Sequence, residues 1–481
     1  MAASGPEGQE TDLQSRSGSY TVAVALVAAV GGLMFGYDIG VIADAQKGIK
    51  AAFDLGTFRL EVVVASVLAG SFVGAIVAGR LSDRIGRRWT NVWGGALFAV
   101  GCLGCALAVD FWMITAFRVC MGLGVGFSSV AGPLYIAEIA APWSRGAMVS
   151  LYQLAITLGI LLAFLIGLVM AEAWRWHFGI GSLMGGGLVI GMLAMPPSPR
   201  WLVSKGRTAL ALGVLRRTTG SVDAAESELK AIEVRVREEA GERLLPTLKS
   251  NVAVRRALIL AVGLALLQQF SGINAIMFYG PSILEEIGLG GRELLLTASI
   301  GLINVLATFI AIWFVDRLGR RVLLLSGTFL MMLAQVGIGV FAFWIPAAGS
   351  GGADPVTGAS GPGIGALILI FVAIIAFAFS LGPLVWLVIS EIFPAGVRSA
   401  CVGIATAANW TGAFLVALFT LTVLENNSLG TTTVFWLFAG SNVIALVFIL
   451  TKLPETKGVE LERIEEFFSD PVKAGSPAGE S

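Results

Sequence analysis

Twelve apolar stretches, each about long enough to cross a lipid bilayer as a helix, dominate this sequence of 481 residues. Hydrophobic residues make up 56% of the chain and charged residues only 13%, with a mean hydropathy of +0.84. A soluble protein of this length would carry nearly twice that charged fraction. The sequence therefore predicts an all-α membrane protein. The predicted spans are residues 20–45, 60–79, 89–109, 111–139, 146–171, 177–195, 256–286, 293–315, 322–346, 362–390, 396–424 and 430–451.

The spans form two groups of six, separated by a charged central segment. Acidic and basic residues there have helical spacing, and Ala224, Leu229, Ile232 and Val236 supply an apolar face. We expect a small soluble helical subdomain at this point. The predicted divisions are a polar tail (1–19), a six-helix half (20–195), the subdomain (196–255), a second six-helix half (256–452) and a C-terminal tail (453–481).

Basic residues predict the orientation of the spans. The tail before the first span lacks the basic region and cleavage site of a signal peptide, so we expect that span to remain as helix one. The positive-inside rule then places both termini and the central segment in the cytoplasm. That side collects Arg80, Arg84, Arg87, Arg88, Arg145, Arg317, Arg320, Arg321 and Arg398, and the other side has Lys47, Lys50, Arg59, Arg175 and Arg292.

The two halves repeat each other. The motif Asp-Arg-x-Gly-Arg-Arg begins at Asp83 and again at Asp316, each time between equivalent spans. An acid lies seven residues before an arginine in each half: Glu138 before Arg145, and Glu391 before Arg398. Duplicated six-helix halves are typical of transporters, so we expect two pseudo-symmetric bundles.

Asp38 is an acid inside the first apolar stretch. An ionised aspartate near the middle of a membrane helix costs roughly 2.5–3.5 kcal/mol, so it is expected to face water, pair with a cation or carry a proton. The alternative is a position among the lipid headgroups. The apolar sequence continues from Ile39 to Ala43, which favours the interior.

Enzyme chemistry has few candidate residues. The four cysteines lie in apolar stretches, where Cys102-x-x-Cys105 is interpreted as packing rather than a redox or metal site, and the single histidine, His177, is expected in an interfacial aromatic belt. No nucleotide-binding G-x-x-x-x-G-K-[ST] motif is present. We therefore expect no enzyme, no cofactor, no metal and no nucleic-acid partner.

A set of motifs, in order along the chain, resembles that of the sugar porters of the major facilitator superfamily, over residues 20–464. The motifs are Gly79–Arg88, Arg118 with Gly122–Gly126, Tyr135–Glu138, Ser198–Leu202, Gln268–Asn274, Gly382–Trp386 and Pro454–Gly458. The chain departs from the family's pattern at two positions. Family members often have tyrosine at the position of Phe278, and glutamate commonly stands at the position of Pro197.

The resemblance implies a sugar site between the halves, near the bilayer midplane. Amides suit a neutral, hydroxyl-rich ligand because they donate and accept hydrogen bonds, and indole rings suit its C–H faces. Gly272 and Pro281 predict a helix that breaks beside the site. The alternative for each amide is a hydrogen bond between helices. The implied residues are Gln153, Gln268, Gln269, Asn274, Asn304 and Asn409, with Trp386 and Trp410 packed on the ring.

The resemblance also implies proton coupling, because the symporters have aspartate at the position of Asp38 and mammalian facilitative glucose transporters have asparagine. Arg118 would be its neighbour. Our hypothesis is that the guanidinium and a proton compete for the carboxylate. Gating ion pairs at the inner helix ends are implied for Asp83, Arg87, Glu138, Arg145, Asp316, Arg320, Glu391 and Arg398; the alternative is topology signalling with weak surface pairs.

The sequence thus predicts a secondary active transporter that imports a hexose or pentose with a proton by alternating access. Passive uniport and a transport-incompetent sugar sensor are the alternatives. We expect a monomer in the lipid bilayer of a bacterial inner membrane. The motifs do not identify the sugar.

Overall fold

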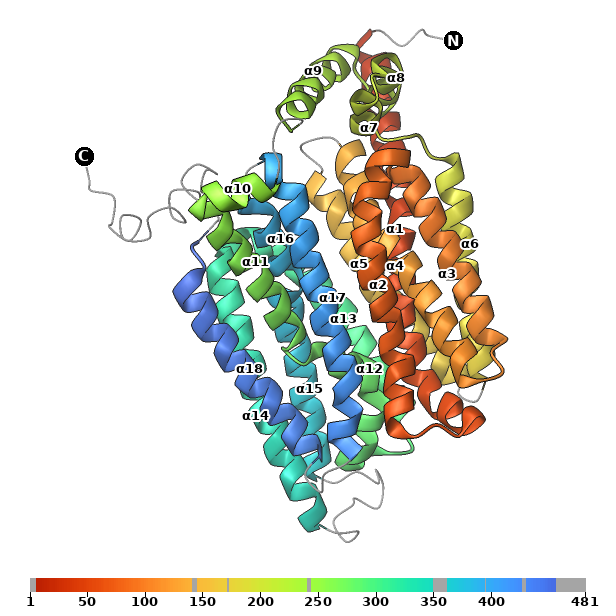
Figure 1. The fold of residues 1–481 in the computed structure, drawn as a ribbon, viewed down its shortest axis with the longest axis vertical. Coiled ribbons are helices and arrows are strands. Elements are labelled where there is room, and N and C mark those ends of the chain that lie inside the picture. Colours follow the sequence, from red (N-terminus) through yellow and green to blue (C-terminus); the bar gives the residue numbers. More distant parts are fainter. Residues whose placement is uncertain are drawn as a thin grey trace, which may run out of the picture.

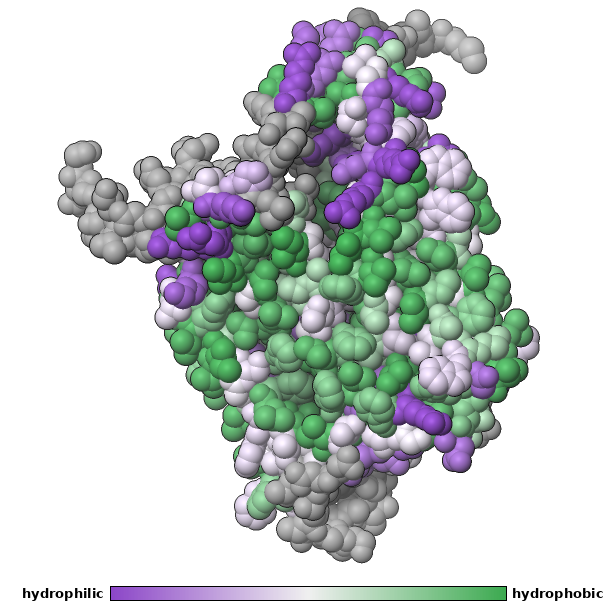
Figure 2. All heavy atoms as spheres, viewed as in Figure 1, coloured by the Kyte–Doolittle hydropathy of each residue, from purple (hydrophilic) through white to green (hydrophobic). Residues whose placement is uncertain are grey.

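The computed structural model describes residues 6–140, 145–170, 173–239, 244–348, 361–393, 395–425 and 430–455. All regular elements in these ranges are helices (Figure 1). Twelve helical segments are long and apolar enough to cross a membrane, and they coincide with the twelve predicted stretches. Figure 2 shows the consequence: a broad hydrophobic surface covers the middle of the molecule, with hydrophilic residues gathered toward its ends.

The first bundle consists of six unbroken helices. Most approach their neighbours through glycine, which lets backbones lie close together in a membrane. On α2, for example, a Cβ atom at Gly70 would lie 2.2 Å from the carbonyl oxygen of Val119 on α4. The helices are α1 (Pro6–Phe53), α2 (Thr57–Ile85), α3 (Arg87–Ala106), α4 (Phe111–Ile139), α5 (Arg145–Val169) and α6 (Trp174–Ala194).

The second bundle differs because two of its spans are broken. The first broken span turns at Gly272, whose φ of +86° is a conformation that favours glycine. The second is interrupted at Ser380, just before Pro383, which has no N–H to donate. The spans are α11 (Val252–Gln269) with α12 (Ile273–Leu284) and η1 (Glu285–Leu289), α13 (Glu293–Leu318), α14 (Arg320–Ala348), α15 (Gly361–Phe379) with α16 (Leu381–Glu391), α17 (Ala395–Glu425) and α18 (Gly430–Lys452).

Four short helices lie between the bundles, in the predicted subdomain. The first three share a hydrophobic core of their own, which includes Leu202, Leu215 and Ile232, whereas Leu248 of the fourth packs against the core of the second bundle. One predicted position is wrong: Ala224 is exposed and Ala225 is buried, because the face that carries Leu229, Ile232 and Val236 includes the residue four positions before Leu229. The helices are α7 (Pro199–Ser204), α8 (Thr208–Thr219), α9 (Val222–Glu239) and α10 (Leu244–Ser250).

The subdomain, the start of α1 and the end of α18 all lie at one end of the molecule (Figure 1). We call this the terminal end, and the opposite end, which carries Lys47 and Lys50, the distal end. The helices of the two bundles diverge toward the terminal end and lie together at the distal end.

Two glycines on α6 allow a matched test of this close packing. A Cβ atom at Gly185 would lie 2.6 Å from the carbonyl oxygen of Gly95 on α3, whereas one at Gly187 would meet no heavy atom within 4 Å. We expect Gly185→Ala to destabilise the protein by about 1–3 kcal/mol through overpacking and to lower its thermal midpoint in detergent. Gly187→Ala should leave that midpoint unchanged; equal midpoints for the two variants would contradict the observed α3–α6 packing.

Candidate functional site

Asp38 and Arg118 form an ion pair in the interior of the first bundle. Arg118 on α4 is fully buried, and its Nη1 lies 3.2 Å from Oδ1 of Asp38 on α1, which is 2% exposed. The other two guanidinium nitrogens donate to α2: Nε to the carbonyl oxygen of Val63 at 2.7 Å, and Nη2 to that of Val64 at 3.3 Å. Arg118 therefore connects α1, α2 and α4 through one planar group.

This pair is energetically consequential because both charges are out of contact with water. Attraction between buried ions roughly offsets their desolvation, but removal of one partner leaves the other uncompensated. A proton that binds Asp38 removes its charge and weakens the contact with Arg118, whose carbonyl partners on α2 remain. The arrangement therefore can convert protonation of Asp38 into looser coupling of α1 to α4.

Tyr37, beside Asp38, connects α1 to two further helices. Its hydroxyl donates to the carbonyl oxygen of His177 on α6 at 2.7 Å, and the His177 ring nitrogen Nε2 lies 3.0 Å from the carbonyl oxygen of Ala163 on α5. The expected position of His177 in an interfacial belt is wrong: the residue is buried, because Tyr37 and Ala163 give it polar partners inside the bundle. Trp176, which is exposed, faces outward instead.

Four of the predicted sugar-binding amides form one hydrogen-bonded chain in the second bundle. Asn274 donates to Oε1 of Gln269, and Gln269 Nε2 donates to Oε1 of Gln268 at 3.3 Å. Asn409 Nδ2 on α17 donates to the same Gln268 oxygen at 2.7 Å. The break between α11 and α12 places Gln268 and Gln269 before the turn and Asn274 after it, so amides from both segments meet.

The Gln268 side chain also joins the two broken spans. Its Nε2 donates to the carbonyl oxygens of Leu381 at 2.6 Å and Gly382 at 3.2 Å, both in the first turn of α16. The interruption at Ser380 and Pro383 brings these carbonyls within reach of a side chain. A ligand that forms a hydrogen bond with Gln268 would therefore affect the contact between the two broken spans.

The remaining predicted sugar-binding residues lie on four helices. Gln153 on α5 and Trp386 on α16 are half-buried, and Asn304 on α13 is buried. Trp410 on α17 packs on Phe35 of α1, with ring centroids 5.2 Å apart and planes tilted by 60°. This aromatic contact joins the two bundles three residues from Asp38.

Ion pairs between the bundles lie at the distal end. Lys47 on α1 lies 2.8 Å from Glu285 and 3.0 Å from Glu293, and Lys50 lies 3.1 Å from Glu425 on α17. The structure is therefore closed at the distal end.

A buried acid on α2 adds to this closure. Oε1 of Glu61 accepts the backbone N–H of Thr422 on α17 at 2.6 Å, and its other carboxylate oxygen accepts the Thr422 hydroxyl. Thr57, at the start of α2, donates its hydroxyl to Glu425. Sequence analysis missed Glu61, Thr422 and Glu425, because their contacts join residues more than 350 positions apart.

The predicted gating residues form pairs within each bundle at the terminal end. Arg87 Nε lies 3.0 Å from Glu138 Oε1, and Arg320 Nη2 lies 3.2 Å from Glu391 Oε1, in equivalent positions of the two halves. Arg87 also pairs with Asp83 at 3.1 Å. Arg398 donates to the carbonyl oxygen of Phe393 at 3.0 Å. The side chains of Arg145 and Asp316 lie outside the described residues.

Known proteins share this architecture over nearly the whole chain. The family profile described as "Sugar (and other) transporter" matches residues 24–468. The chain belongs to the sugar transporter family of the major facilitator superfamily.

Relatives of this transporter include bacterial sugar–proton symporters. The galactose-proton symporter of Escherichia coli is 39% identical over 460 residues, covering 94% of this chain and 95% of the relative. The arabinose-proton symporter of the same organism is 37% identical over 446 residues, covering 92% of each. A solved structure of the proton:xylose symporter XylE from Escherichia coli, bound to 6-bromo-6-deoxy-D-glucose, is 30% identical, with a TM-score of 0.78 and coverage of 94% of this chain and 99% of that chain.

The segment that follows the last span of each half contacts its bundle differently. In the first half this segment has Pro197 where glutamate is common. In the second half, the Glu455 carboxylate accepts the backbone N–H groups of Arg320 at 2.9 Å and Arg321 at 3.1 Å, at the start of α14. In the first half, Ser198 donates instead to Glu138. The start of the subdomain therefore bonds the first bundle through neutral groups, the Ser198 hydroxyl and the indole of Trp201, whose Nε1 donates to the carbonyl oxygen of Asp83 at 3.2 Å.

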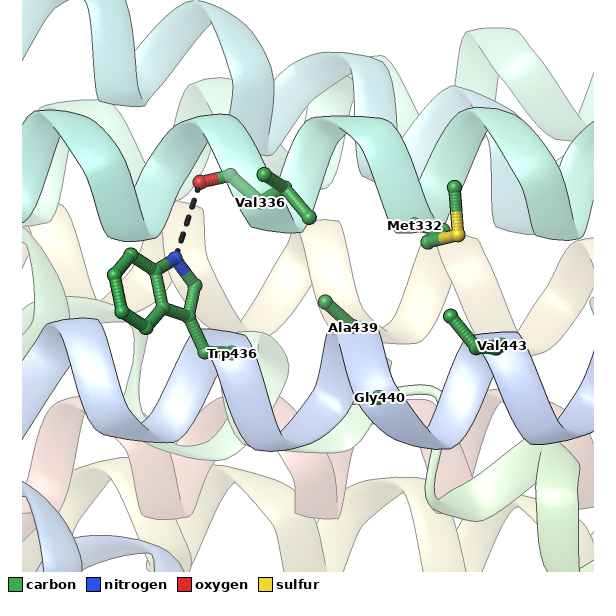
Figure 3. Close-up of a pocket in the computed structure, with 6 residues that line it drawn as sticks. All are labelled: Met332, Val336, Trp436, Ala439, Gly440 and Val443. Atoms are coloured by element: carbon green, nitrogen blue, oxygen red, sulfur yellow. Dashed lines mark hydrogen bonds between the residues drawn. The ribbon is translucent and has the colours of Figure 1, made fainter.

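An apolar groove between α14 and α18 lies apart from the site (Figure 3). Trp436 Nε1 donates to the carbonyl oxygen of Val336 at 3.3 Å across it. The groove contains none of the predicted sugar-binding residues and has the apolar lining expected of a lipid-facing surface. It is lined by Met332, Val336, Trp436, Ala439, Gly440 and Val443.

Distal closure by Glu61 is testable. Gln at this position cannot accept two hydrogen bonds from Thr422 with both side-chain ends, so we expect Glu61→Gln to lengthen the distance between spin labels at Phe58 on α2 and Phe419 on α17, both exposed. Electron double resonance on the purified protein measures that distance.

The matched control for Glu61 is Glu286→Gln, an exposed acid at the same end of the transporter. This variant should keep the parent distance distribution. If Glu61→Gln also keeps it, Glu61 does not contribute to the closed distal end.

Proposed function

We propose that this transporter imports a monosaccharide together with a proton by alternating access. The observation that carries the proposal is the buried pair of Asp38 and Arg118 at the junction of α1, α2 and α4. A passive carrier of a neutral sugar has no need for a titratable acid in its interior. The relatives named as galactose-proton and arabinose-proton symporters support the same coupling.

The proton acts on Asp38 in this proposal. With Asp38 ionised, Arg118 holds α1 against α4; a proton on Asp38 replaces that attraction, and α1 is released to move. The membrane potential can drive sugar accumulation through this proton. One charge moved through 100 mV contributes about 2.3 kcal/mol, which corresponds to accumulation of the sugar on the order of fifty-fold. The aromatic contact of Phe35 with Trp410 links the same helix to the sugar-binding side.

The sugar binds among the amides of the second bundle. Gln268, Gln269, Asn274 and Asn409 already form a chain of donors and acceptors. Hydroxyl groups can replace these mutual bonds without leaving an amide unpaired, which is the condition for a polar site in a membrane. We assign Gln153, Asn304, Trp386 and Trp410 to the same site, and the ligand to the hexose or pentose class.

In alternating access, the two bundles close together at one end of the transporter while they separate at the other. The positive-inside rule supports a cytoplasmic terminal end, so the state with the distal end closed faces inward. In the outward-facing state, we assign inner closure to the charged groups of the duplicated motifs: Asp83, Arg87, Glu138, Arg145, Asp316, Arg320, Glu391 and Arg398. We also propose that the transporter acts as a monomer in a bacterial cell membrane.

The test is uptake into proteoliposomes that contain the purified protein. We expect one of D-galactose, D-xylose, L-arabinose or myo-inositol to accumulate above its external concentration when the outside is made acidic, and a protonophore to abolish this accumulation. Equilibration without accumulation would identify a passive uniporter instead.

The Asp38→Asn variant separates coupling from transport. Asparagine keeps the size of the side chain but cannot release or bind a proton, so concentrative uptake should be lost while counterflow of labelled sugar continues. Asp54→Asn is the matched control: Asp54 lies in an exposed turn with a φ of +50°, which asparagine tolerates. Concentrative uptake by Asp38→Asn would contradict the assignment.

A further inference from the structure

The break between α11 and α12 leaves backbone carbonyl groups without helical partners. The N–H of Gly272 donates to the carbonyl oxygen of Gln269 at 3.4 Å, and the hydroxyl of Ser271 donates to that of Gln268 at 2.6 Å. The carbonyl of Ser271 itself precedes α12, whose first backbone bond is accepted by Gly272. In a membrane interior this carbonyl needs a donor from elsewhere.

Two fully buried amides from other helices supply that donor. Gln335 on α14 donates its Nε2 to the carbonyl oxygen of Ser271, and Asn442 Nδ2 on α18 lies 3.3 Å from the same oxygen. Asn442 Nδ2 also lies 2.7 Å from Oε1 of Gln335. The two amides and the carbonyl thus form one closed polar cluster, which we call the hinge anchor.

The hinge anchor is tightly enclosed. A Cβ atom at Gly272 would lie 2.6 Å from the ring of Phe438 on α18 and 3.0 Å from Nε2 of Gln335. The turn therefore touches both α14 and α18, and the two amides hold its position against the rest of the second bundle. Neither amide belongs to the predicted sugar-binding set.

The middle of α12 is held differently. Gln46 on α1 of the first bundle donates its Nε2 to the carbonyl oxygen of Phe278 at 2.6 Å, beside a non-helical residue, Tyr279. This bond crosses between the bundles at the distal end and belongs to the closed state. The segment α12 is therefore fixed within its own bundle at Ser271 and bonded to the other bundle at Phe278.

We propose that Gln335 and Asn442 are positioning residues that hold the Ser271 carbonyl as the pivot of α12, and so set the placement of Asn274 relative to Gln268 and Gln269. This rests on the proposed function, because the amides on either side of the pivot are the proposed sugar site. Loss of either donor frees a buried carbonyl, loosens the turn and misplaces Asn274.

The experiment uses Gln335→Met, which keeps the length of the side chain but removes the donor, and Asn442→Ala. Uptake of D-galactose, D-xylose, L-arabinose and myo-inositol is measured in proteoliposomes, and the sugar that the parent transports fastest is used. We expect KM to rise about tenfold for each variant, with kcat within twofold of the parent. Since both amides donate to one oxygen, the double variant should show less than the product of the two effects.

Amide hydrogen exchange of the full chain in lipid nanodiscs gives a second readout that needs no sugar. Exchange should rise at residues 271–284 and stay at the parent level in the first bundle. The matched control is Asn91→Leu, which removes a fully buried amide on α3, far from the pivot, that donates to the carbonyl oxygen of Arg87 at 3.0 Å. It should change neither KM nor exchange at 271–284.

A parent KM with parent exchange at 271–284 in folded Gln335→Met or Asn442→Ala protein would overturn the inference, as would equal effects from Asn91→Leu. If the parent transports none of the four sugars, the proposed function fails for them, and exchange at 271–284 alone then supports or overturns the hinge anchor.

Discussion

The contact of Arg118 with Asp38 is the interaction on which the rest of this transporter depends. It places two opposite charges in the interior of a membrane bundle, where neither is stable without the other. Since the guanidinium also bonds two carbonyls of α2, it remains held when Asp38 changes its protonation state. The site therefore has one fixed ion and one that a proton can neutralise, which is the minimum needed for coupling.

The buried ion pair lies in the first bundle, and the chain of hydrogen-bonded amides lies in the second. The first bundle has unbroken helices and contains the buried ion pair, whereas the second has two broken spans joined by Gln268. A neutral sugar needs adaptable donors and acceptors rather than charges, and helix breaks bring backbone carbonyls to such a site. Helix α1 connects the two regions, because Phe35 contacts Trp410 three residues before Asp38.

Much of this arrangement could be predicted because its signals are local. Apolar length predicts the spans, Gly272 with Pro281 predicts the break in the seventh span, and an acid inside an apolar stretch singles out Asp38. Gln335 and Asn442 carry no such signal, since an isolated amide in a span looks the same whether it binds ligand, lipid headgroup or backbone. His177 was misplaced for the same reason: its buried partners, Tyr37 and Ala163, are known only once three helices are packed.

Sugar-induced proton movement tests the central claim most directly. Proteoliposomes with no imposed gradient of pH or voltage, and with free counter-ion flow, are given external sugar while a dye reports the external pH. The account predicts alkalinisation of the medium as sugar enters, because each sugar brings a proton bound at Asp38. Sugar entry with no change in external pH would contradict it.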